Sequence, residues 1–256
     1  MRMPAVFIGH GSPMNTLESN RWTDAWRELG RSVPRPRAVL AVSAHWYLNA
    51  TAVTAMPRPR TIHDFYGFPD ELFAFDYPAA GEPELAETVA QRCAPTWVGL
   101  DRDSWGIDHG TWSVLAHVFP EADVPVVQLS LDATKSFEEH LALGAQLSSL
   151  RDDGVMIVCS GNVVHHLGRL EWGNRGGAPW AESFDAAARE LLAEAPGDLA
   201  RLRERPEFSS AVPTPDHFLP LLYLGGLAAA DGRGADLLVG GCTYGSLSMA
   251  SYLLDG

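Results

Sequence analysis

The sequence predicts an α/β fold in which a central, largely parallel β-sheet carries helices on both faces. Short, continuously apolar runs alternate along the chain with longer segments of helical periodicity. Strands that are apolar on both sides are typical of parallel sheets, because helices cover both faces of such sheets. The 256 residues contain no internal repeat and no linker-like tract. We therefore expect a single domain over residues 1–256.

Each predicted element follows from a local pattern. Runs rich in Val, Ile, Leu and Ala predict buried strands at 5–9, 38–46, 51–56, 124–131, 154–161 and 236–242. Helical periodicity predicts helices at 15–30, 83–93, 111–119, 136–151, 179–194 and 215–229. The first helix has a capping-box pattern from Asn15 to Glu18, and the last has Thr214 as a predicted N-cap before Pro215.

Composition excludes several classes of function. A net charge of −13 argues against nucleic-acid and anionic-membrane partners, which require a basic face. The longest apolar stretch, 218–230, contains Pro and Gly and is too short to span a bilayer. Cys93, Cys159 and Cys242 are far apart, which indicates neither a zinc knuckle nor a disulfide framework and favours a cytoplasmic location. The N-terminal residues lack the features of a secretory signal, and we expect none.

Histidines gather where the predicted strands end. His10 follows the first strand in "GHGSPM", His45 ends the second in "SAHWY", and His165 follows the fifth in "SGNVVHHL". His109 in "GIDHGTW" and His217 in "TPDHFLP" occur in segments punctuated by Gly or Pro. One such histidine is usually a hydrogen-bonded structural residue. Several at one edge of a sheet predict a mononuclear metal site, because imidazole suits Zn, Fe, Cu and Ni.

The "GHGSPM" stretch partly matches three other motifs. A P-loop needs a Lys, a dinucleotide-binding loop needs a third Gly, and a nucleophile elbow needs a second Gly after the Ser. The stretch lacks each of these residues at the required place. We therefore interpret Ser12 as a loop residue, and we expect Gly9 and Gly11 to leave room beside a metal or a substrate.

Seven motifs occur in an order that resembles a known family. They are "GHGSPMN", "SAHWY", "TIHDFYGFP", "GIDHGTWSVL", "PVVQLSL", "SGNVVHHL" and "TPDHFLPLLY". Together they resemble the DODA-type branch of the class III, LigB-like extradiol ring-cleavage dioxygenases. The resemblance implies one α/β catalytic domain with a mononuclear non-haem metal site. It also implies that Fe(II) is needed for activity and that Zn(II) is plausible in the isolated protein.

The resemblance also assigns roles to the five histidines. His10, His45 and His217 match the metal ligands of this branch. His165 matches a position that is either a fourth metal contact or the acid–base histidine, and His109 matches a second catalytic histidine near substrate or oxygen. Asp216, beside His217, is an alternative ligand, but adjacent helical residues point about 100° apart, so both cannot easily bind one ion.

The implied reaction inserts O₂ into the ring of a small aromatic diol, DOPA-like or related. Aromatic residues near the histidines are expected to bind this flat substrate: Trp46, Tyr47, Phe65, Trp105 and Phe218. The long Pro-rich and aromatic segment 56–84 is expected to be a lid or a pocket wall. We further expect Asp108 to orient His109, and Ser160 or Asn162 to orient His165.

Two other functions remain open at this point. The same ligands suit a zinc hydrolase or amidase that acts through metal-bound hydroxide. A metal-binding protein without chemistry is a third reading, but His109 and His165, in addition to three candidate ligands, favour an enzyme. The sequence does not specify the catechol, and both a monomer and a small homo-oligomer are compatible with it.

Overall fold

A mixed sheet of eight strands forms the centre of the molecule. It is described in a computed structural model that covers residues 2–256. In spatial order its strands are β5 (Gly99–Asp101), β3 (Ala52–Thr54), β7 (Val126–Asp132), β2 (Ala38–Leu48), β8 (Val155–Gly161), β1 (Ala5–Gly9), β12 (Ser251–Leu254) and β9 (Asp236–Val239). The four central strands β7, β2, β8 and β1 are parallel, while β12 and β9 are antiparallel to their neighbours. The predicted fold class is confirmed.

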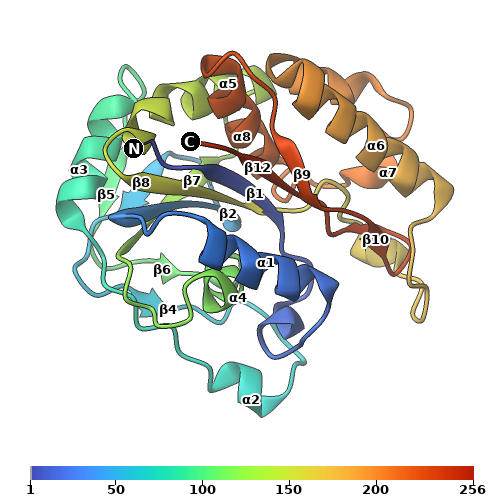
Figure 1. Cartoon of the computed structure of the whole chain (residues 1–256), viewed down its shortest axis with the longest axis horizontal. Coiled ribbons are helices and arrows are strands. Elements are labelled where there is room, and N and C mark those ends of the chain that lie inside the picture. The colour runs from blue at the N-terminus through green and yellow to red at the C-terminus, as the bar shows by residue number, and fades with distance from the viewer. Residues whose placement is uncertain (1) are drawn as a thin grey trace.

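Helices cover both faces of this sheet (Figure 1). One face carries α3 (Pro83–Arg92), α5 (Phe137–Gln146), α6 (Pro179–Glu194), α7 (Phe208–Ala211) and α8 (Leu219–Ala230). The other face carries α1 (Arg21–Ser32), α2 (Asp70–Phe73) and α4 (His109–Val118). Each side encloses its own buried apolar cluster, so the central strands are buried on both faces, as their continuous apolar runs predict.

Short elements complete the chain. They are the 3₁₀ helices η1 (Pro13–Thr16), η2 (Leu147–Arg151), η3 (Leu167–Arg169) and η4 (Pro196–Glu204), and the paired strands β4 (Arg60–Thr61) with β6 (Gly106–Ile107) and β10 (Cys242–Thr243) with β11 (Leu247–Ser248). Within residues 2–256, no helix is both long enough and apolar enough to cross a membrane.

Two predicted helix starts are corrected. The capping box of α1 is formed by Asn20 and Thr23, because the chain from Asn15 first makes a 3₁₀ turn. α8 begins at Leu219, and Thr214 precedes it by a turn in which the Phe218 N–H donates to the Pro215 carbonyl. This late start leaves His217 in the turn before the helix rather than in the first helical turn.

Candidate active site

The histidines predicted at the sheet edge do lie at the carboxyl ends of neighbouring parallel strands. His10 follows β1, and its N–H donates to the Gly161 carbonyl at the end of β8, at 3.1 Å. His45 lies in β2 where the pairing with β7 changes register between Val42 and Tyr47. The Asn162 N–H donates to the His217 carbonyl at 2.8 Å, which ties the turn before α8 to the end of β8.

The "GHGSPM" loop uses its glycines for contacts with the chain, which corrects our expectation of clearance for a ligand. A Cβ on Gly9 would lie 2.7 Å from the backbone of Ala250. Gly11 has φ +64°, which favours glycine, and a Cβ there would meet the Met249 side chain. Ser12 is the N-cap of η1, where its hydroxyl accepts from the Met14 N–H at 3.2 Å.

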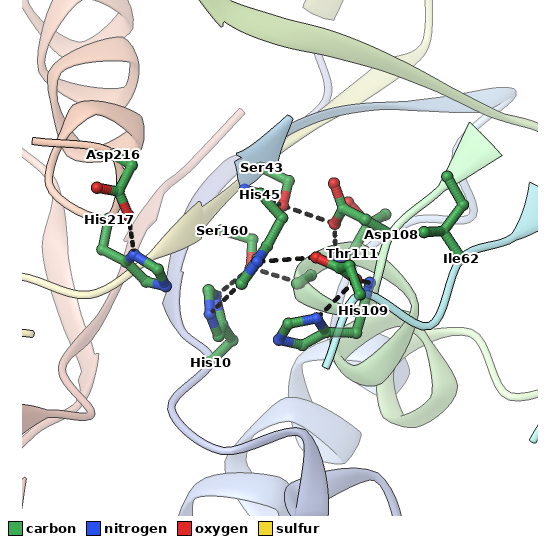
Figure 2. A network of polar contacts seen from close by, with 12 residues as sticks. His10, Ser43, His45, Ile62, Asp108, His109, Thr111, Ser160, Asp216 and His217 are labelled. Carbon is green, nitrogen blue, oxygen red and sulfur yellow. Dashed lines mark hydrogen bonds and ion pairs between the residues drawn. The ribbon is translucent and has the colours of Figure 1, made fainter. Parts of the chain in front are cut away.

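Hydrogen bonds fix which nitrogen of His10 and of His45 faces inward. The Ser160 hydroxyl donates to the Gly110 carbonyl, so it accepts from His10 Nδ1–H at 2.9 Å. His45 Nδ1 lies 2.9 Å from a carboxylate oxygen of Asp64 and donates to it. Each ring, when neutral, therefore presents an Nε2 lone pair, and these two Nε2 atoms lie 3.2 Å apart (Figure 2).

This spacing fits one metal ion between the two rings. Two nitrogen ligands about 2.1 Å from one ion and about 100° apart are separated by about 3.2 Å. Two lone pairs that face each other at this distance repel unless a cation lies between them. The donor chemistry and the spacing thus both suit a divalent metal bound by imidazole.

In His109 and His217, as in His10 and His45, a neighbouring side chain forms a hydrogen bond with Nδ1. His109 Nδ1 donates to the other carboxylate oxygen of Asp64 at 2.8 Å. His217 Nδ1 pairs with the carboxylate of its neighbour Asp216 (Figure 2). Asp216 is therefore engaged in orienting His217, an arrangement common around metal-bound histidines.

Two geometric criteria select different histidine trios. His10, His45 and His109 each place one nitrogen so that the three atoms lie within 4.8 Å of one another. The ring centroids of His10, His45 and His217 form a nearly equilateral triangle with sides of 5.2, 5.0 and 5.3 Å. Three imidazoles on one ion would place their ring centroids about 5 Å apart. The His45–His109 centroid distance of 3.8 Å is short for two ligands of one ion.

His165 differs from the other four histidines. Its ring stacks on that of His217 with centroids 3.5 Å apart and an interplanar angle of 4°. Its backbone N–H donates to the Ala211 carbonyl at 2.9 Å. Ser160 and Asn162 do not orient it: Ser160 contacts His10, and the Asn162 amide donates to the Ser248 carbonyl at 2.7 Å. That expectation is corrected, because both side chains point toward other elements.

The carboxylates around the histidines favour a positive charge beside His45. Burial holds the pKa of His10 well below its usual value, and nearby histidines lower it further. Burial also opposes the charged form of His45, but its hydrogen bond to Asp64 and the charges of Asp108 and Asp64 raise its pKa. Burial would raise the pKa of Asp64, yet its hydrogen bonds to His109 and His45 hold it far below the usual range. The same negative charges of Asp64 and Asp108 would stabilise a metal cation bound beside His45.

The other three histidines that line the cavity, His109, His165 and His217, have lowered pKa values. Burial lowers the pKa of His217 to about 4, against the opposing effect of Asp216. Burial, reinforced by His217, lowers the pKa of His165 to about 2. Burial and the charge on His45 also lower the pKa of His109, although Asp64 opposes them. A neutral imidazole retains the lone pair that binding a metal or accepting a proton requires.

Asp108 does not orient His109, which corrects another expectation. It is the N-cap of α4, where its carboxylate accepts from the Thr111 N–H at 3.2 Å and from the Ser43 hydroxyl at 2.7 Å (Figure 2). The Gln128 amide also donates to it. These bonds point the fully buried carboxylate toward β2 and β7, so the orienting role at His109 belongs to Asp64.

A cavity of about 540 Å³ opens onto the histidines. His10, His45, His109, His165, His217 and Asp64 line it, together with the apolar side chains Met14, Trp22, Phe65, Phe68, Leu167, Leu170, Trp172, Tyr244, Leu247 and Met249. Its size and its mixture of aromatic walls with a few polar groups suit a small aromatic molecule. A larger hollow of about 710 Å³ lies along residues 57–80 and includes only His63 of the nine histidines.

The aromatic residues predicted to bind substrate do not all lie at the cavity. Phe65 lines the cavity. Trp46 and Trp105 instead stack on each other with centroids 5.8 Å apart, because alternation along β2 turns Trp46 away from the side of His45. Tyr47 is partly exposed farther along β2, and Phe218 is buried among Phe137, Phe184 and Phe208.

The sequence reasoning missed Asp64 and Gly110. Asp64 stands in "TIHDFYGFP", and a carboxylate within a histidine-bearing motif was the available signal. Gly110 follows His109, and a Cβ there would lie 2.7 Å from Cδ2 of His45, so only glycine lets α4 start this close to β2. Segment 56–84 is a wall of the site at Asp64, Phe65 and Phe68.

Comparisons with known proteins identify the family of this chain. Residues 5–254 match the family described as the catalytic LigB subunit of aromatic ring-opening dioxygenase. The chain is 47% identical over 256 residues to the 4,5-DOPA dioxygenase extradiol of Escherichia coli K12, covering 98% of this chain and 94% of that protein. It is 36% identical over 255 residues to the 4,5-DOPA dioxygenase extradiol of Beta vulgaris, covering 96% and 94%.

A solved structure has the same fold. The crystal structure of an uncharacterized protein from Escherichia coli K12 matches with a TM-score of 0.86 and 41% identity, covering 99% of this chain and 100% of that one. None of these findings supports the hydrolase alternative. The chain therefore belongs to the LigB family of aromatic ring-opening dioxygenases and is a non-haem, metal-dependent extradiol ring-cleavage enzyme.

Proposed function

We propose that this enzyme opens the ring of a DOPA-like catechol with O₂ at a single Fe(II) held by His10, His45 and His217. The observation that carries the proposal is the pair of inward Nε2 atoms of His10 and His45, 3.2 Å apart. The centroid triangle supports His217 as the third ligand. When bound, Fe(II) supplies a redox-active centre at which a catechol and O₂ can react, whereas Zn(II) would occupy the same imidazoles without redox chemistry.

The residues around this centre divide the remaining tasks. A catechol must lose a hydroxyl proton before its ring can be attacked, and His165, which lines the cavity beside His217, is our proposed acceptor. His165 is partly exposed at the cavity and stacks on a ligand rather than forming the triangle with His10 and His45. His109 keeps a free Nε2 toward the same space and is the proposed second proton-handling group, facing substrate or oxygen.

The shape and lining of the cavity support an aromatic substrate with a polar side chain. Phe65 and Phe68 provide flat apolar surface beside the histidines. Glu18 also lines the cavity and offers a carboxylate to an ammonium group. The relatives from Escherichia coli and Beta vulgaris are both named for 4,5-DOPA, which supports a DOPA-like catechol here.

We further propose that residues 1–256 form one catalytic domain in a cytoplasmic enzyme. The family match over residues 5–254 and the pairing of β12 with β1 support a single unit. Cys93, Cys159 and Cys242 are free and buried, which supports a reducing compartment.

Anaerobic reconstitution tests the proposal. The apoprotein is loaded with Fe(II) or with Zn(II), mixed with L-DOPA, protocatechuate or another catechol, and then exposed to O₂. The Fe(II) form should consume O₂ and produce a new visible absorbance with L-DOPA, and the Zn(II) form should not. If no catechol gives oxygen uptake at full iron occupancy, the proposed function is wrong.

A further inference from the structure

One carboxylate holds two histidines of the site. Asp64 Oδ2 lies 2.9 Å from His45 Nδ1, and Asp64 Oδ1 lies 2.8 Å from His109 Nδ1. His45 comes from β2 and His109 is the first residue of α4, so the carboxylate joins two elements from different parts of the chain. The two rings lie with centroids 3.8 Å apart.

We propose that Asp64 is a positioning residue that fixes the tautomer and orientation of His45 and His109 together. A carboxylate only accepts, so each imidazole must keep its proton on Nδ1. Each ring must then turn an unprotonated Nε2 toward the cavity, one as a metal ligand and the other as a proton-handling group. The ligand and the proton-handling group are thus set by one side chain.

Further hydrogen bonds, besides those to the two rings, hold Asp64 and the residues before it. The His109 N–H donates to Asp64 Oδ1 at 3.2 Å. Two residues before Asp64, the Ile62 N–H donates to the Ile107 carbonyl at 2.8 Å, and the Ile62 carbonyl accepts from Trp112 Nε1–H at 2.8 Å. The segment is therefore anchored to β6 and α4 by hydrogen bonds that do not involve the proposed metal ligands, and the carboxylate is preorganised.

Asp216 provides an internal contrast. It pairs with one ring only, that of His217, and it is the neighbour of that residue in the sequence. Loss of Asp216 would loosen one ligand. Loss of Asp64 would release a ligand and the proton-handling histidine together, so metal affinity and turnover at full metal occupancy should both change.

The wild-type protein gives the first test. In zinc-loaded protein with ¹⁵N-labelled histidine, NMR should show His45 and His109 both protonated at Nδ1, assigned with His45→Gln and His109→Gln variants. A proton on Nε2 of either ring would overturn the proposal. This measurement needs neither catalytic activity nor an Asp64 variant that folds.

The second test is Asp64→Asn with Asp70→Asn as the matched control. Asp70 lies in the same segment, is exposed, and loses the same charge. An amide offers one accepting oxygen and a donating nitrogen, so Asp64→Asn cannot satisfy both rings. We expect zinc affinity, measured by chelator competition, to fall about 10- to 100-fold. With saturating Fe(II), kcat should fall at least about tenfold and the KM for catechol should change little. Asp70→Asn should match the wild type.

The outcomes are distinct. Wild-type zinc affinity or wild-type kcat in a folded Asp64→Asn variant would contradict the proposal, and if that variant does not fold, the wild-type spectrum decides. The expectation for kcat rests on the proposed dioxygenase function, whereas the zinc affinity and the spectrum do not. A protein that fails to cleave catechols but loses zinc on Asp64→Asn would refute that function and support this inference.

Discussion

The inner end and the mouth of the cavity are built in different ways. At the inner end, His10, His45, His109 and His217 each have Nδ1 held by a hydrogen bond to a neighbouring side chain. The mouth is lined by Glu18, Leu167, Trp172 and Tyr244 from loops and short turns, and by Trp22 from the first turn of α1. Trp172 is 80% exposed there and lies with its ring centroid 5.4 Å from that of Tyr244.

This difference separates chemistry from substrate choice. A ring held at one nitrogen presents the other in a defined direction, which metal binding and proton transfer require. Apolar contacts on irregular chain are less directional and tolerate change, so they suit selection among substrates. Changes at the inner end should therefore affect metal content and kcat, whereas changes at the mouth should affect KM.

The largest effect is expected for His10→Ala. His10 is buried, its Nδ1 is bonded to Ser160, and its Nε2 faces that of His45, so the substitution removes a proposed metal ligand. Metal analysis should find less than stoichiometric iron, and activity should fall by more than about 10³-fold. Full metal content in this variant would contradict the assignment of His10 as a metal-binding residue of the inner end.

His165→Gln should separate metal binding from turnover. The ring of His165 stacks on His217 outside the centroid triangle, so most of the metal should remain. Loss of the proposed proton acceptor should lower kcat by about 10²- to 10⁴-fold. Metal analysis and steady-state kinetics on one preparation check both expectations, and an empty site would make His165 a ligand.

Asp216→Asn should have an intermediate effect. The amide keeps the shape of the carboxylate but weakens its hold on His217 Nδ1. We expect metal affinity to fall about 10- to 100-fold, with most activity restored by excess Fe(II). Competition titration measures the first and kinetics at high Fe(II) the second. If excess metal restores nothing, Asp216 has a role beyond holding one ring.

The metal-free protein should lose stability as the pH falls. The pKa of His217 is about 4 in the folded protein, below the usual value of 6.5, because the ring is buried. Between these values the unfolded chain binds a proton that the folded protein does not, so the free energy of unfolding decreases on acidification. One such group contributes up to about 1.4 kcal/mol per pH unit. Urea unfolding at several pH values measures it, and a flat profile from pH 6.5 to 4 would contradict the burial argument.

The smallest effect is expected for Trp172→Ala at the mouth. Its exposed ring borders the cavity without contacting the histidines, so the KM for L-DOPA should rise about 3- to 10-fold at unchanged kcat and metal content. Steady-state kinetics on the iron-loaded variant tests this. A fall in kcat that matches that of His165→Gln would remove the distinction between the two regions.

The sequence could predict much of the sheet and less of the site. The strand over residues 5–9 matches β1, because a buried parallel strand is a continuous apolar run between polar residues. The sequence does not predict the antiparallel strand β12, because its run of only four residues is too short to be distinguished from a loop. His10 and His45 were predicted at the sheet edge from their place after or within apolar runs.

Side-chain contacts between residues far apart in the sequence could not be predicted. Asp64 contacts two histidines whose distance from it in the sequence carries no pattern, and Asp108 was assigned to His109 by adjacency alone. Trp46 was assigned to the pocket because it follows His45, although alternation along a strand turns neighbouring side chains to opposite sides. Adjacency in sequence is a weak guide to contact, and the side chains that hold the site depend on tertiary packing.

A single turnover with isotopically labelled oxygen tests the central claim most directly. Enzyme with one equivalent of Fe(II) is mixed anaerobically with one equivalent of L-DOPA, exposed to ¹⁸O₂, and the product is examined by mass spectrometry. Extradiol cleavage needs no external reductant, so the account predicts a ring-opened product that contains both oxygen atoms of one O₂ molecule. Recovery of intact L-DOPA, or of a product without labelled oxygen, would contradict it.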